Sequence, residues 1–86
     1  MEFRLSRYAE EEMTRRGIPR AWVDTVLKTP HQRVPQPGAK EILQSRVEAG
    51  DGRIYLVRAV VATDREPPVV ITVYRTSKIA KYWRPE

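Results

Sequence analysis

An 86-residue chain is long enough for one small domain, whose core is only just large enough to fold alone. Its 16 basic and 11 acidic side chains leave a formal net charge of +5, which favours a polyanionic partner such as RNA or DNA, or an acidic protein. The absence of cysteine and the single histidine exclude disulfide, thiolate-metal and multi-histidine sites, so we expect no cofactor and no metal.

Hydropathy gives no sign of a membrane protein. No apolar run approaches the roughly 20 residues that span a bilayer, and no signal peptide opens the chain. We therefore expect a cytoplasmic protein that makes no membrane contact.

The first third of the chain predicts two helices after a short extended lead-in at Glu2–Leu5. Ser6 is a good N-cap and Gly17 a good C-terminal stop, so the first helix runs between them, with a narrow apolar stripe that places it on a surface. Pro19 favours the start of a second helix and Pro30 ends it. Its buried face is the set Trp22, Val23, Val26 and Leu27.

The remainder predicts strands. Pro30–Ala39 is a loop or a poor edge strand because it holds three prolines and a glycine. Asp51-Gly52 indicates a hairpin turn, and the short connections on both sides of the next strand require antiparallel pairing. The expected strands are Lys40–Val47, Arg53–Thr63 and Val69–Tyr74, followed by a bent strand end or a short helix at Arg75–Trp83.

This order of elements predicts one α+β domain over residues 1–86. We expect both N-terminal helices to pack on one face of a three- to four-stranded antiparallel sheet. If Arg75–Trp83 is helical, its apolar residues Ile79, Tyr82 and Trp83 pack inward, while Lys78 and Lys81 face solvent.

Arg75 is the most informative single residue, because it ends the densest β-favouring run in the chain. A charge there is costly unless it is exposed or paired. One interpretation is a phosphate clamp, since guanidinium matches phosphate oxygens bidentately. The alternative is an ion pair with a helix carboxylate such as Glu11 or Glu12.

Other candidates have similar alternatives. Arg58 either forms a second cationic wall of the same anion-binding site or, as is slightly favoured, makes an ion pair on the face of the sheet. Lys78 and Lys81 are more simply solvated charges, and Tyr82 and Trp83 more simply core residues than base-stacking platforms. His31 could join a catalytic triad only from a proline-flanked loop, and no phosphate loop, metal-ligand spacing or nucleophile elbow occurs.

Three segments together resemble a known family: LSRYAEEEMTRRGIP, WVDTVLKTP and VVITVYRTSKIAKYW. They are similar to a bacterial and archaeal group of short proteins, a domain of unknown function with an "HA…RGI…VYRTSKI" pattern, which in turn resembles the RelE/ParE/MqsR-like toxins of toxin–antitoxin pairs. The likeness covers nearly the whole chain, and its C-terminal part is the most specific.

The resemblance implies a RelE-like fold and a toxin-like, metal-independent endoribonuclease that cleaves mRNA, in some cases on the ribosome, and is neutralised by a cognate antitoxin protein. Tyr8 stands where the family pattern has histidine. A tyrosine, with a pKa near 10, is a poor base at neutral pH, so cleavage would then depend on positioning and cationic stabilisation.

The leading hypothesis is therefore an RNA-cleaving domain in which Arg75 stabilises the charge of the transition state. The expected catalytic residues are Arg75, Tyr8, Tyr82 and Lys78, and the expected RNA-binding residues are Arg58, Lys81, Arg84 and His31. The alternatives are a catalytically silent basic module that binds RNA or an acidic protein, and a structural subunit of a larger assembly.

Overall fold

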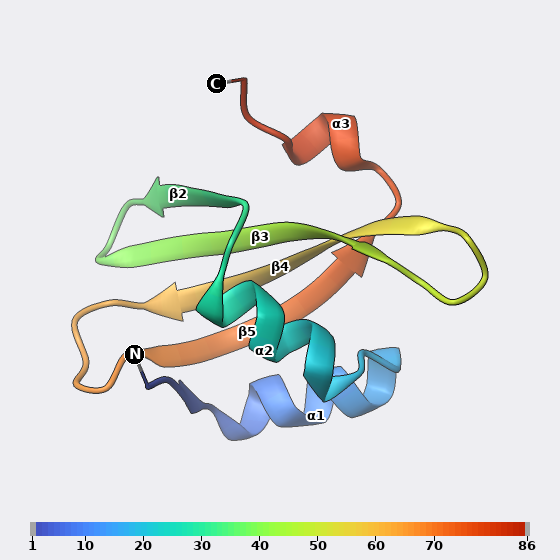
Figure 1. Cartoon of the computed structure of the whole chain (residues 1–86). Coiled ribbons are helices and arrows are strands. Elements are labelled where there is room, and N and C mark those ends of the chain that lie inside the picture. The colour runs from blue at the N-terminus through green and yellow to red at the C-terminus, as the bar shows by residue number, and fades with distance from the viewer. Residues whose placement is uncertain (1, 86) are drawn as a thin grey trace.

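One five-stranded sheet organises the protein, with the strand order β1-β5-β4-β3-β2 (Figure 1). The computed structural model describes residues 2–85. Its elements, in chain order, are β1 (Arg4–Leu5), α1 (Arg7–Arg16), α2 (Arg20–Lys28), β2 (Gln32–Gln36), β3 (Lys40–Glu48), β4 (Ile54–Ala62), β5 (Val69–Thr76) and α3 (Ile79–Tyr82).

Local signals in the sequence set the ends of α1 and α2. The Ser6 hydroxyl accepts the Ala9 N–H at 3.0 Å and so caps the first turn of α1. Gly17 adopts the left-handed conformation at φ 64°, and its N–H bonds the carbonyls that α1 leaves unpaired. Pro19 occupies the N-cap position of α2 without a side-chain hydrogen bond, and α2 ends at Lys28, with Thr29 as its C-cap before Pro30. The predicted bounds of both helices are confirmed.

The central strand β4 pairs antiparallel with β3 on one side and with β5 on the other, as predicted. The proline-rich segment forms β2, an edge strand paired with β3. Arg4–Leu5, however, pairs in parallel with Val69–Val70, so the sheet is mixed and has five strands. The expectation of three or four antiparallel strands is wrong, because a two-residue strand leaves no periodic signal in the sequence.

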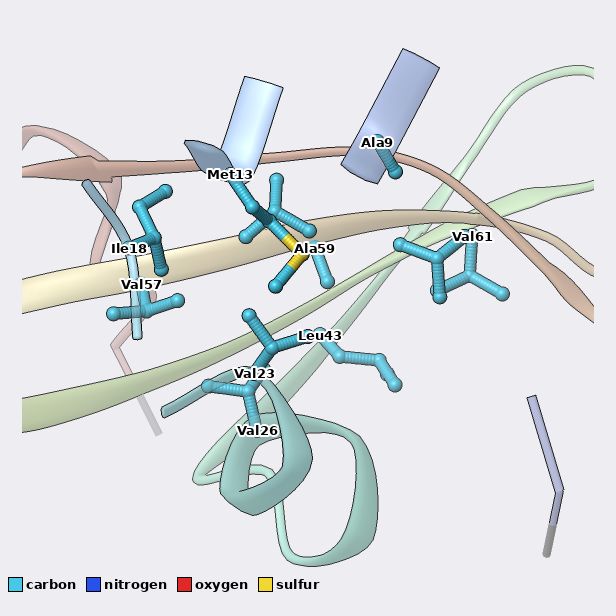
Figure 2. Close-up of a cluster of buried hydrophobic side chains, with 11 residues drawn as sticks. Ala9, Met13, Ile18, Val23, Val26, Leu43, Val57, Ala59 and Val61 are labelled. Atoms are coloured by element: carbon cyan, nitrogen blue, oxygen red, sulfur yellow. The ribbon is translucent and has the colours of Figure 1, made fainter. Parts of the chain in front are cut away.

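The two N-terminal helices pack on one face of the sheet, as expected. The core there joins side chains of both helices to alternate residues of the strands (Figure 2). A register shift between Val60 and Val61 changes the pairing with β5, so that Val70 and Val73 both point into this core. Because α1 also contributes Ala9 and Met13, it belongs to the core layer more fully than its narrow stripe suggested.

A third helix corrects the two-helix expectation. Of the two forms considered for Arg75–Trp83, the structure has both in succession: β5 continues to Thr76, and α3 follows. Figure 1 shows α3 near β2 and β3, away from α1 and α2. Its apolar residues are half-buried and its lysines exposed, as predicted for a helical form. No helix within residues 2–85 has the length and apolarity needed to cross a bilayer.

Alternation along β4 divides the sheet into two unlike faces. Val57, Ala59 and Val61 point to the helices, whereas Arg58 points to the other side. We call this other side, opposite α1 and α2, the open face. Among residues 2–85, the C-terminal segment 79–85 lies over it, through contacts of Tyr82 and Arg84 with side chains of the strands.

Leu43 tests the position of the core. It is 1% exposed on the central part of β3 and belongs to the cluster beneath the helices. Leu43→Ala removes buried methyl groups and leaves a cavity, so we expect the free energy of unfolding to fall by about 2–5 kcal/mol. Urea denaturation measures this change. The control is Leu27→Ala, because the Leu27 side chain is only half-buried. If Leu43→Ala lowers the free energy of unfolding no more than this control does, the assignment is contradicted.

Glu12 tests the electrostatics of α1. Its side chain hydrogen-bonds Arg15 at 2.6 Å and Arg16 at 2.9 Å, and the Arg15 hydrogen bond chiefly holds the pKa of the Glu12 carboxyl below its usual value, although burial opposes this. A lowered pKa contributes stability above the unfolded-state pKa, and that stability is lost as pH falls through the folded-state pKa. We therefore expect Glu12→Gln to flatten the acid side of a plot of melting temperature against pH. The control is Glu10→Gln, an exposed carboxyl of the same helix, which should leave the slope unchanged.

Candidate nucleic-acid interface

A buried arginine lies at the centre of the open face. Arg58 is 7% exposed, and within residues 2–85 no carboxylate pairs with it. Its Nε donates to Gln44 Oε1 at 2.8 Å, and its Nη1 donates to the Tyr74 hydroxyl. The Tyr82 ring covers the guanidinium, with its centroid 4.2 Å from Cζ. The favoured ion pair for Arg58 is therefore wrong, and neutral groups surround the charge.

Two glutamines extend this arrangement toward the edge of the sheet. Gln44 Nε2 donates to Gln32 Oε1 at 2.8 Å, which is possible because these residues are direct partners across β3 and β2. Both side chains are buried. We call Gln32, Gln44, Arg58 and Tyr74 the polar floor. Within the described chain no buried side-chain nitrogen or oxygen is left without a hydrogen-bond partner, so the floor is fully satisfied.

The C-terminal segment closes over the polar floor through backbone groups. Gln44 Nε2 also donates to the Tyr82 carbonyl at 3.2 Å, and Gln32 Nε2 donates to the Arg84 carbonyl at 2.7 Å. In return, the Arg84 N–H donates to Gln32 Oε1 at 3.1 Å. The segment is thus fixed by side chains of β2 and β3 that lie far from it in the sequence.

Arg46 and Trp83 form an exposed platform at the rim of the same face. The Arg46 guanidinium lies 4.0 Å from the centroid of the Trp83 ring, and the His31 ring meets Trp83 edge-on. Arg46 is exposed and Trp83 half-buried. The platform therefore presents a cation and an aromatic ring to solvent at one place.

His31 has a defined hydrogen-bonding role at this rim. Its Nδ1 accepts the backbone N–H of Arg46 at 3.1 Å. A neutral imidazole whose Nδ1 accepts carries its proton on Nε2. The ring can therefore donate a hydrogen bond outward from Nε2, but in this state it offers solvent no basic nitrogen.

An apolar groove of about 590 Å³ adjoins the platform. Its walls come from the hairpin side of β3 and β4 and from the C-terminal segment, with Arg46 as its cation. The lining residues are Arg46, Ile54, Ile79, Ala80, Trp83 and Pro85. Ile54 is 52% exposed, which is high for an isoleucine on a strand.

Positive charge predominates over this part of the surface. The cations of the open-face strands and of the C-terminal segment make no ion pair with an acid among residues 2–85. The alternation of β3 also places one carboxylate, that of Glu48, on this face. Those cations are Lys40, Arg46, Arg58, Lys78, Lys81 and Arg84. No three His, Asp or Glu side chains within residues 2–85 gather as a metal site.

Arg75 lies elsewhere. It is opposite Val57 in the register, so it points to the helix face, where its guanidinium is 5.0 Å from the Tyr55 ring centroid and 6.0 Å from that of Trp22. No ion pair to Glu11 or Glu12 forms, since those carboxylates pair with arginines of α1. The alternative considered for Arg75 is therefore wrong, and the residue is exposed, as the clamp interpretation required.

The structure separates the four expected catalytic residues. Tyr82 contacts Arg58 and Tyr74 on the open face, whereas Arg75 is on the helix face, so these two do not share a site. Tyr8 is an exposed residue of α1, and Lys78 is an exposed residue before α3. The expected grouping of Arg75 with Tyr82 is wrong, because the face of a strand-end residue depends on its register with β4.

The four expected RNA-binding residues lie on the open face or at its rim. Arg58 and Tyr82 are in direct contact, Lys81 lies 5.4 Å above the Tyr82 ring, and His31 and Arg84 line one shallow depression at the rim. Sequence reasoning missed Gln32, Gln44, Tyr74 and Arg46. The available signal was polar residues at alternate positions of β3, where Gln44 and Arg46 share a face.

Comparisons with known proteins identify a family but no characterised relative. Residues 5–75 match the model of a domain of unknown function, DUF4258. No curated protein and no solved structure matches the chain. Because the matched region covers most of the 86 residues, this protein belongs to the DUF4258 family.

Proposed function

We propose that this protein acts on RNA and binds single-stranded RNA through the open face of its sheet. The observation that carries this proposal is the Arg46–Trp83 platform beside the apolar groove. Single-stranded nucleic acids are bound by aromatic rings on which bases stack and by cations that hold the backbone. The platform supplies both within one 4.0 Å contact.

The surrounding charge supports the same ligand. Lys81 and Arg84 are exposed on the segment that carries Trp83, and neither forms an ion pair among residues 2–85. Cations without nearby acids give a positive potential that attracts a phosphate backbone. By contrast, Arg33 on the edge strand is neutralised by Glu41 at 2.7 Å and contributes less.

The finer proposal is that bound RNA is cleaved. By its resemblance to RelE/ParE/MqsR-like toxins, the protein would be a metal-independent endoribonuclease acting on mRNA and held inactive by an antitoxin. Such cleavage needs positive charge where the transition state becomes more negative. Arg58 lies on the same face as the platform and has two tyrosines beside it, so it fits this role better than Arg75.

A catalytically silent RNA-binding module is the second candidate, and one observation favours it. The single histidine, His31, uses Nδ1 as an acceptor and so presents no basic nitrogen. The side chains beside Arg58 that carry hydroxyls are Tyr74 and Tyr82, and a phenol is in general a poor catalytic base. An assay for cleavage is therefore needed apart from an assay for binding.

Binding is tested by a salt titration with a single-stranded oligoribonucleotide. We expect Arg46→Gln to weaken RNA binding and to reduce the slope of log affinity against log salt by about one. The matched control is Lys28→Gln, which removes the same charge from an exposed position at the end of α2. Fluorescence anisotropy over several salt concentrations gives both slopes. Equal losses in the two variants would show non-specific attraction and refute the interface.

Cleavage is tested by incubating mRNA with the protein in excess EDTA. If the finer proposal holds, RNA fragments appear, and Arg58→Gln lowers the rate by about 10²–10³-fold, the scale of losing one preorganised electrostatic donor. Arg75→Ala is the comparison variant, because it lies on the opposite face and should leave cleavage near the wild-type rate. Both variants are assayed below their melting temperatures. Intact RNA with normal binding would establish the silent module.

A further inference from the structure

Two hollows of unlike chemistry meet at the end of the C-terminal segment. The apolar groove of about 590 Å³ has Arg46 as its cation, whereas the depression beside it, of about 290 Å³, has mostly polar walls. Pro85 lines both hollows. The residues that line the depression are His31, Gln32, Arg33, Val34, Arg84 and Pro85. An apolar hollow joined to a polar one suits a ligand with one apolar and one polar end.

Direct contacts also connect the two hollows. The Trp83 ring of the groove meets the His31 ring of the depression, and the two ring centroids are 6.3 Å apart. The backbone N–H of Arg46, another groove residue, donates to His31 Nδ1 at 3.1 Å. The groove and the depression are therefore held close enough for a single nucleotide to reach both.

The groove has the character of a surface that binds a nucleobase. Trp83 holds the Arg46 guanidinium 4.0 Å from its ring centroid, and Arg46 is exposed. Bases stack on guanidinium planes as well as on aromatic rings, so a base can lie on Arg46 without disturbing the contact with Trp83. Ile54, which is 52% exposed, lines the same groove and gains burial when a base covers it.

The charges around the two hollows decide where a phosphate lies. Arg84 is exposed in the depression and makes no ion pair among residues 2–85. The neutral His31 ring beside it can donate from Nε2. On the hairpin side of the groove, by contrast, the exposed Glu48 is the direct register partner of Ile54. A phosphate is therefore attracted to the depression and repelled from the far end of the groove.

We propose that one nucleotide occupies both hollows, with its base on Arg46 in the apolar groove and its phosphate beside Arg84 and His31 in the depression. The proposal rests on the proposed function for the source of the nucleotide, which is single-stranded RNA. It needs no movement of the C-terminal segment, so the hydrogen bonds between Gln32 and Arg84 and the contact between Arg46 and Trp83 stay intact. A mononucleotide is the smallest ligand that uses both hollows.

The two tryptophans provide a probe and its internal control. Trp83 lines the groove, whereas Trp22 lies on the helix face beside Tyr55. We follow both indole N–H signals by NMR as adenosine monophosphate is added to the full chain at constant ionic strength. The Trp83 signal should shift and the Trp22 signal should stay in place. Equal shifts of the two signals would show non-specific binding and overturn the site.

Two fragments of the nucleotide test its two ends on the wild-type protein. Adenosine lacks the phosphate, and ribose 5-phosphate lacks the base. Each should bind about tenfold more weakly than adenosine monophosphate, because one loses the charged hydrogen bonds and the other the stacking. Adenosine that binds as tightly as adenosine monophosphate would refute the phosphate position, and ribose 5-phosphate that does so would refute the base position.

Two variants at exposed positions separate the same two ends. Arg84→Gln keeps the backbone hydrogen bonds to Gln32, but it should abolish the tenfold preference for adenosine monophosphate over adenosine. Ile54→Ser should weaken the binding of both ligands by the same factor, about threefold, and leave their ratio unchanged. Lys28→Gln, on α2, is again the matched control for charge. An Arg84→Gln loss no larger than that of the control would contradict the assignment.

A single-stranded oligoribonucleotide distinguishes RNA from a free nucleotide as the ligand. It should bind more tightly than adenosine monophosphate, because Lys81 is exposed on the same segment and adds a phosphate contact. A mononucleotide that binds equally well would overturn RNA as the source. If the oligoribonucleotide binds through Arg46 but the mononucleotide has no advantage over adenosine, the nucleotide site is refuted and the proposed function stands. Failure of the oligoribonucleotide to bind would refute the proposed function itself.

Discussion

The structure depends on the fact that its central strand has to be covered on both sides. In β4, Val57 and Ala59 require an apolar cover, and α1 and α2 provide it. Arg58, between them in sequence, faces the other way and requires polar partners. The two sides of this one strand therefore need different kinds of packing. A domain of this size has enough apolar residues for only one complete hydrophobic core. The helices form that core, and a seven-residue segment serves the opposite face.

This division explains why the open face is polar beneath and cationic at its rim. A buried charge needs neutral acceptors when no carboxylate is at hand, and Gln44 and Tyr74 supply them from the strands on either side of β4. Gln44 is in turn oriented by Gln32 on the next strand. The hydrogen-bond chain thus crosses four strands, so the shape of the floor is fixed by the sheet register rather than by loops.

How far the sequence predicts this protein depends on how local each signal is. Ser6, Gly17 and Pro30 act within one turn of helix, and the bounds that they predicted are right. The pairing of Arg4–Leu5 with Val69–Val70 joins segments more than sixty residues apart through two residues, which no pattern marks. The polar floor likewise exists only through register, because Gln32, Gln44, Arg58 and Tyr74 meet as cross-strand neighbours. Sequence spacing therefore singled out Arg58 and Arg75 but could not show that they lie on opposite faces of the sheet.

The two arginines also differ in what their surroundings leave for them to do. Arg75 stacks on Tyr55 and Trp22, so its aliphatic stem and guanidinium cover the end of the apolar core while its charge stays in water. These ring contacts give Arg75 a structural role on the helix face. Arg58 instead has its charge enclosed beneath Tyr82, with Gln44 and Tyr74 as its neutral hydrogen-bond partners. Its enclosed charge is therefore balanced by dipoles and not by a carboxylate among residues 2–85, which is a costly arrangement. The sheet register thus decides the surroundings of both arginines. It leaves the guanidinium of Arg75 in water on the helix face and encloses that of Arg58 on the open face.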